Sequence, residues 1–133
     1  MNERKTVSTG SPWEPLVGYS RAIRIGDRVE VAGTTAMRDG RVIGGSDAYE
    51  QAKAALTIIK ESLEQLGASM ADVVRTRMYV TDISQWEQIG RAHGEFFKDV
   101  RPVATMVEVK ALIDPALLVE IEAEAVVKAA DGR

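Results

Sequence analysis

The stretch LLVEIEAEAVV, residues 117–127, alternates between two kinds of side chain. One set of alternate positions is wholly aliphatic: Leu117, Val119, Ile121, Ala123 and Ala125. The other set includes three glutamates: Leu118, Glu120, Glu122, Glu124 and Val126. Because successive side chains of a strand point to opposite faces of a sheet, the alternation predicts a strand with one buried face and one partly charged face.

The aliphatic face of that strand must pack against another element. Residues 46–67 have the pattern of an amphipathic helix that could do so. Apolar residues recur there at spacings of three and four, which places them on one stripe. Asp47 and Glu50 are arranged like a capping box at the start. Gly67 is typical of the residue that ends a helix.

A second helix is predicted to begin at Ser84. Its apolar stripe consists of Trp86, Ile89, His93, Phe96 and Phe97. We interpret Trp86 as a core residue and His93 as a structural histidine rather than a general base. Gly90 and Gly94 are expected to allow the close approach of another backbone.

The remaining segments read as strands and turns. A hairpin is predicted over residues 21–33, a second turn over 38–45, and strands over 72–82 and 103–109. Two helices can cover only one side of the sheet. We therefore predict an α+β domain with a mixed sheet, both helices on one face, and the other face open to water or to another subunit.

The composition of the chain excludes several classes of function. The 133 residues are predicted to form one domain, residues 1–133, with loose ends at 1–3 and 128–133. The chain has no cysteine, one histidine, and a net charge of −3 with scattered basic residues, which argues against a metal site and against nucleic acid as a partner. Without a long apolar run or a signal peptide, we expect a cytoplasmic protein that contacts no membrane and uses no cofactor.

Four segments together resemble the RidA family, the reactive intermediate deaminases also called YjgF-like proteins. They are GYSRAI (18–23), RVEVAGTTA (28–36), RPVATMVEV (101–109) and VEIEAEAV (119–126). The resemblance implies a chorismate-mutase-like fold and a homotrimer whose sheets form a central barrel, with small-molecule clefts between subunits. It also implies hydrolysis of enamines and imines such as 2-aminoacrylate, in which an arginine holds the substrate carboxylate and a glutamate places a water.

One half of the family's site is retained. The resemblance assigns the pocket tyrosine to Tyr19, the water-positioning glutamate to Glu120, and a hydroxyl beside the arginine to Thr105. Tyr19 is equally well interpreted as a packing residue at a subunit boundary. We therefore expect the half of the site that holds a water to be present.

The carboxylate-binding half departs from the family pattern. Ala104 stands at the arginine position, Ala32 where many members have serine, and Gly90 where they have asparagine. A charged hydrogen bond contributes about 1.5–3 kcal/mol, so its loss should lower transition-state binding at least about ten- to a hundredfold. Efficient 2-aminoacrylate deamination is therefore not expected. If another cation replaces the arginine, Arg77 is the first choice, because strand parity places it on the sheet surface of Glu120.

The other glutamates of the last strand have a structural interpretation. Glu122 and Glu124 fit a cross-strand charge ladder with Arg75 and Arg77, or a solvated channel of the trimer, better than an acid–base or metal site. For Glu120, a role in the site and a role in the ladder remain open on the residues alone.

Three functions remain as hypotheses. The leading one is a homotrimer that binds a small metabolite between subunits and hydrolyses an imine-like bond with water placed by Glu120. The alternative is a metabolite-binding or regulatory module without turnover. The third is endoribonuclease activity of the L-PSP type, against which the acidic balance and the sparse aromatic residues argue.

Overall fold

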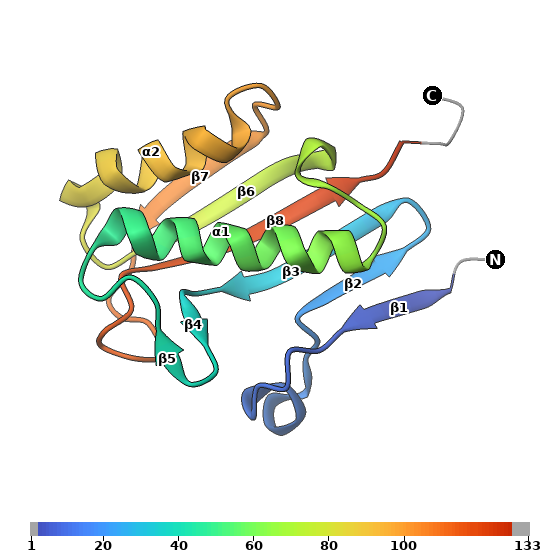
Figure 1. The fold of residues 1–133 in the computed structure, drawn as a ribbon, viewed down its shortest axis with the longest axis horizontal. Helices are drawn as coiled ribbons and strands as arrows, with labels where there is room; N and C mark the ends of the chain where they lie inside the picture. Colours follow the sequence, from blue (N-terminus) through green and yellow to red (C-terminus); the bar gives the residue numbers. More distant parts are fainter. Residues whose placement is uncertain (1–2, 129–133) are drawn as a thin grey trace.

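The computed structural model of the protein describes residues 3–128. A six-stranded sheet has the strand order β1-β2-β3-β8-β6-β7, and both long helices cross the same face of it (Figure 1). Neighbouring strands are antiparallel except β6 and β7, which run parallel. The predicted α+β architecture, a mixed sheet with two helices on one face, is confirmed. The predicted loose ends fall almost entirely outside the described residues.

The strands of the sheet are β1 (Arg4–Val7), β2 (Ala22–Ile25), β3 (Arg28–Thr34), β6 (Val73–Val80), β7 (Val103–Glu108) and β8 (Val119–Val126). A separate ribbon consists of β4 (Met37–Arg38) and β5 (Arg41–Val42). The long helices are α1 (Ala48–Gln65) and α2 (Trp86–Phe97). Short helical turns occupy Glu14–Gly18, Met70–Asp72 and Ile83–Gln85.

The core lies between the helices and the sheet. The aliphatic set of β8 is buried there, whereas its three glutamates are only partly buried on the opposite, open face. α1 contributes Leu56, Ile59 and Leu63, and α2 contributes Ile89 and Phe97. Burying a side chain of this size stabilises the fold by about 1.5–3 kcal/mol. This layer therefore determines which face of β8 stays open.

The two helices begin differently from one another. At α1 the Asp47 carboxylate accepts a hydrogen bond from the Glu50 N–H at 3.2 Å, which is one half of the predicted capping box. The Asp47 N–H donates to the Gly44 carbonyl oxygen instead of to the Glu50 side chain. The predicted start of the second helix at Ser84 is wrong, because α2 begins at Trp86. The Asp82 carboxylate accepts from both the N–H and the hydroxyl of Ser84, and this closes a short turn before the helix.

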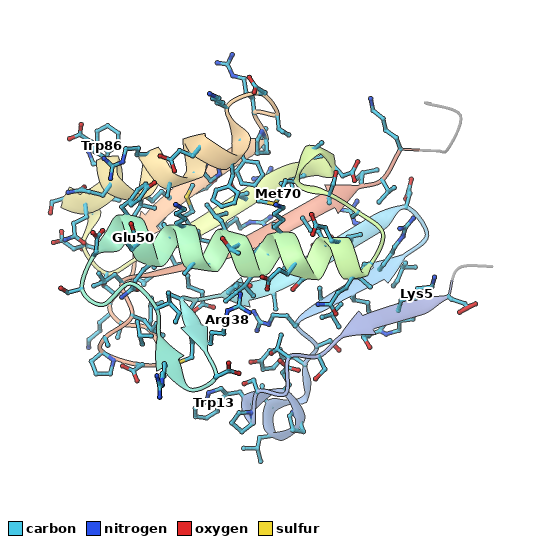
Figure 2. The ribbon with its side chains drawn as sticks, in the orientation of Figure 1. Lys5, Trp13, Arg38, Glu50, Met70 and Trp86 are labelled. Carbon is cyan, nitrogen blue, oxygen red and sulfur yellow. The ribbon has the colours of Figure 1, made fainter. Side chains whose placement is uncertain are left out.

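The predictions for Trp86, Gly90 and Gly94 are also wrong. Trp86 is 56% exposed at the outer end of α2 and lies outside the core (Figure 2). No atom lies within 4 Å of a Cβ built at Gly90 or Gly94, so neither glycine serves a close backbone approach within the described residues. In β6, Val73 is buried and Val74 is 43% exposed, because the register of β6 and β8 shifts between Val73 and Arg75.

The open space at Gly94 gives a prediction about stability. Gly94→Ala adds a methyl group without a clash and removes backbone freedom from the unfolded chain. We expect the free energy of unfolding to rise by about 0.5–1 kcal/mol. Urea denaturation measures this change. The control is Gly67→Ala, which should destabilise because Gly67 has φ +76°; a loss of stability at Gly94 would contradict the open environment.

Candidate functional site

The carboxylate of Glu120 lies directly over the backbone of Gly33. β3 and β8 are antiparallel neighbours whose register shifts between Val31 and Thr34, as at a β-bulge. A Cβ atom at Gly33 would overlap Glu120 Oε2 and lie 2.9 Å from the carboxyl carbon of Glu120. Any side chain at this position would therefore displace the carboxylate.

The surroundings of Glu120 alter its acidity. Burial raises the pKa of the Glu120 carboxyl, the Arg21 guanidinium opposes that rise, and the charge of Glu122 adds to it. A carboxyl whose pKa moves toward neutrality exchanges protons more readily with a bound water or ligand. Glu120 is therefore the candidate general acid–base of this site.

The raised pKa predicts a pH-dependent change in stability. The contribution of such a carboxyl to the free energy of unfolding is present below its unfolded-state pKa and is lost as the pH rises through the higher folded-state pKa. Glu120→Gln stays neutral, so this variant should be more stable than the wild type at neutral pH. Because the carboxyl is only half-buried, solvent screening limits the gain to less than about 1 kcal/mol.

Chemical denaturation at neutral pH and at about pH 4 measures this effect. The gain should shrink at the lower pH, where the wild-type carboxyl is also neutral. The exposed Glu64 of α1 supplies the control, and Glu64→Gln should show no such gain. Equal stability of Glu120→Gln and wild type at neutral pH would contradict the effect of burial.

A cation that the sequence analysis did not single out lies beside Glu120. Arg21 directly precedes β2, and its Nη1 donates to the carbonyl oxygen of Gly33 at 2.6 Å and to Thr34 Oγ1 at 2.8 Å. Its guanidinium lies 5.6 Å from the centre of the Tyr19 ring, within the range of a cation–π interaction. The sequence contained a signal for this residue in the GYSRAI segment, where Arg21 follows Tyr19 by two positions. Residues two apart in an extended chain point to the same side, so Arg21 could have been placed beside the pocket tyrosine.

Arg77 shares the open sheet face with Glu120 but is already paired. Its Nη1 donates to Glu124 Oε2 at 2.9 Å and lies 3.9 Å from Glu122 Oε1. The predicted cross-strand ladder is therefore confirmed for Arg77, whereas Arg75 forms no ion pair within residues 3–128. To bind a ligand, Arg77 would have to break its contacts with these two carboxylates.

Ala104 and Thr105, which we call the β7 pair, lie on the edge strand of the sheet. Two strand spacings separate β7 from β8. Ala104 is in register with the buried Thr76, so its side chain lies on the helix side of the sheet, whereas Thr105 is in register with Arg77 on the open face. Sheet geometry places the Cα atoms of Ala104 and Glu120 roughly 14 Å apart.

A single chain assembles only part of the site expected from the sequence. It brings Glu120, Tyr19 and Ala32 into one region, with Ala32 next to Gly33 on β3. It does not bring the β7 pair to them, nor Gly90, which lies on α2 in the helix layer. Each of the two places thus holds both retained and altered positions of the family pattern: Ala32 lies with Glu120, and Thr105 lies beside Ala104 on β7.

Other chemical groups lie in the helix layer. His93 Nε2 is 2.8 Å from Thr76 Oγ1, and burial lowers the pKa of His93, which fits the structural role predicted for it. A pocket of about 230 Å³ is lined by Arg38 of β4 and by Glu50 and Thr57 of α1. Figure 2 labels Arg38 and Glu50. Within residues 3–128, no group of three acidic, histidine or cysteine side chains could hold a metal ion, and no helix is long and apolar enough to cross a membrane.

The chain matches known proteins over nearly its whole length. The family model described as Endoribonuclease L-PSP matches residues 9–127. A solved structure of a YjgF family member from Mycobacterium tuberculosis is 54% identical, with a TM-score of 0.86, and the match covers 94% of this chain and 100% of that one. An uncharacterized protein of Streptomyces coelicolor is 42% identical, with 96% of each chain covered. Human 2-iminobutanoate/2-iminopropanoate deaminase is 28% identical, over 92% of this chain and 90% of its own.

Proposed function

The chain belongs to the YjgF/RidA family, also described as endoribonuclease L-PSP, and we propose that it hydrolyses an imine-like bond of a small metabolite at a site shared by two chains. The family fold expected from the sequence is confirmed by the related structures. The observation that carries the proposal is the half-buried carboxylate of Glu120, held over Gly33 with a raised pKa. The activity named for the human relative supports the same chemistry.

Glu120 performs the proton transfers of the proposed reaction. Its carboxylate accepts a proton from a water molecule while the water oxygen bonds to the C=N carbon and the π electrons pass to the nitrogen. Glu120 returns this proton to the nitrogen, which gives a carbinolamine. Glu120 then takes the hydroxyl proton of the carbinolamine and passes it to the same nitrogen, the C–N bond breaks as the O–H electron pair forms the C=O bond, and ammonia leaves. A positioned general acid–base contributes about 10²–10⁴-fold to such a step.

A second copy of the chain is proposed to complete the site. The β7 pair lies far from Glu120 in one chain, and Ala104 points to the other side of the sheet. β7 is an edge strand with two exposed apolar residues, Val103 and Val107, at 57% and 43%. Proteins usually cover such an edge. A homotrimer would do so, and the mass under native conditions should then be three times 14.5 kDa; a monomer would contradict the shared site.

The proposed substrates are imines and not RNA. The net charge is −3, and the open face beside Glu120 carries Glu122 and Glu124, which repel phosphates. A binding module without turnover remains the second candidate, and the imine assay separates it from a hydrolase.

The test follows carbonyl formation from a panel of imines made in situ. A pyridoxal-phosphate-dependent dehydratase supplies 2-aminoacrylate, and an amino-acid oxidase supplies other 2-imino acids. We expect the wild type to accelerate at least one imine, with slow turnover of 2-aminoacrylate because of Ala104. No acceleration of any imine would contradict hydrolysis and favour the binding module.

A further inference from the structure

We propose that Arg21 binds the anionic group of the ligand and that the natural ligand is therefore a small organic anion. The inference rests on the proposed function, since it names the ligand class of the same site. It places the cation at the start of β2, instead of at the Ala104 position or at Arg77.

The guanidinium of Arg21 is fixed along one edge. Nη1 donates to the Gly33 carbonyl oxygen and to Thr34 Oγ1, and it lies 3.5 Å from the Ala32 carbonyl oxygen. The Thr34 hydroxyl in turn donates to the Ala32 carbonyl oxygen at 2.7 Å. These contacts hold the side chain in one orientation, so its other edge is preorganised.

The other edge of Arg21 is available. Within residues 3–128, neither Nε nor Nη2 of Arg21 forms a hydrogen bond, and Arg21 takes part in no ion pair. Nε and Nη2 lie on the same side of the guanidinium, where two parallel N–H groups match the two oxygens of a carboxylate. A ligand carboxylate would therefore find a bidentate partner there.

The neighbouring acids do not occupy this role. Glu14 is buried, and it accepts hydrogen bonds from the hydroxyls of Ser8 at 2.8 Å and Thr9 at 2.7 Å. Glu120 lies over Gly33 and acts on Arg21 only through space. The charge of a half-buried arginine without a direct carboxylate partner is only partly compensated, so the binding of an anion stabilises it.

Arg21 and Glu120 converge on one residue, which limits the size of the ligand. Nη1 contacts the carbonyl oxygen of Gly33, and the carboxylate covers its Cα. These two atoms of one residue are about 2.4 Å apart. A compound of few atoms can therefore place its anion at Arg21 and its reacting carbon near Glu120. Ionised Glu120 repels that anion, so the contact is weaker than an unopposed arginine fork, and slow turnover of 2-aminoacrylate is expected.

The test uses stable compounds in place of imines. Pyruvate and its neutral analogue pyruvamide are titrated by NMR into wild type, Arg21→Gln and Arg21→Lys. We expect the wild type to bind pyruvate more tightly than pyruvamide, and Arg21→Gln to weaken pyruvate binding about ten- to a hundredfold. Arg21→Lys keeps the charge without the bidentate edge and should show an intermediate loss. Arg75→Gln is the matched control, with the same charge change and an expected shift below about twofold.

The proposal would be overturned by unchanged pyruvate binding in a folded Arg21→Gln variant, or by loss of binding in Arg77→Gln alone. Melting temperatures show whether each variant is folded. If Arg21→Gln is unfolded, the comparison of the two ligands in the wild type decides, and equal binding of pyruvate and pyruvamide would overturn the proposal. Because no turnover is needed, pyruvate binding that depends on Arg21 would support this inference even if no imine were hydrolysed.

Discussion

Glu120→Gln is expected to slow hydrolysis of the best imine by about 10²–10⁴-fold, the usual contribution of a general acid–base. Glutamine has the same shape and can still hydrogen-bond a water, but it cannot accept the proton of that water. Affinity for an anionic product should not fall, because the amide occupies the same space and removes the charge that repels the anion. Initial rates of carbonyl formation and a titration with a stable product measure the two quantities separately.

A substitution on the neighbouring strand β3 tests the role of the same Glu120 carboxylate. Gly33→Ala places a methyl group where Glu120 lies and should also lower turnover. Gly94→Ala adds the same group in open space and should leave turnover unchanged. The role of Glu120 would be refuted if Glu120→Gln kept more than about half of the wild-type rate, since loss of a general acid–base far exceeds a factor of two.

Ala104→Arg is expected to raise the turnover of 2-aminoacrylate about ten- to a hundredfold. An arginine at this position offers a bidentate contact to the substrate carboxylate, and a charged hydrogen bond contributes about 1.5–3 kcal/mol. The gain requires that β7 of one chain meet Glu120 of another, because within one chain Ala104 lies on the other side of the sheet.

The neighbouring position supplies the control for this gain. Val103 lies one residue away and is in register with Arg75 on the open face. Val103→Arg adds the same charge to the same edge strand, but it points to the opposite side. We expect no gain from Val103→Arg. Equal rates for Ala104→Arg and wild type would contradict the importance assigned to the arginine position.

The sequence predicted the parts of the fold that depend on strong periodicity. The alternation in β8 identified the buried face and placed Glu120, Glu122 and Glu124 on the open one. It could not predict the start of α2, because that start depends on the hydrogen bonds of Ser84 to Asp82. Trp86 fitted an apolar stripe but lies where no other element covers it, which is a property of the tertiary arrangement.

The site was predictable only in part, for a similar reason. Strand parity placed Arg77 on the face of Glu120, but its pairing with Glu124 depends on the register of β6 and β8. Arg21 was missed because its role depends on the irregular backbone at Gly33, whose carbonyl it contacts. A pattern of residue types does not reveal a bulge or which carbonyl an arginine reaches.

The most direct test of the shared site is a mixture of two kinds of chain. Wild-type chains lack the arginine, and chains carrying both Ala104→Arg and Glu120→Gln lack the carboxylate, so each alone should hydrolyse 2-aminoacrylate slowly. After the two are dissociated together and reassembled, mixed oligomers contain sites with the arginine from one chain and Glu120 from another. We expect the mixture to form pyruvate faster than either parent. A rate equal to the weighted mean of the two parents would contradict a site shared between chains.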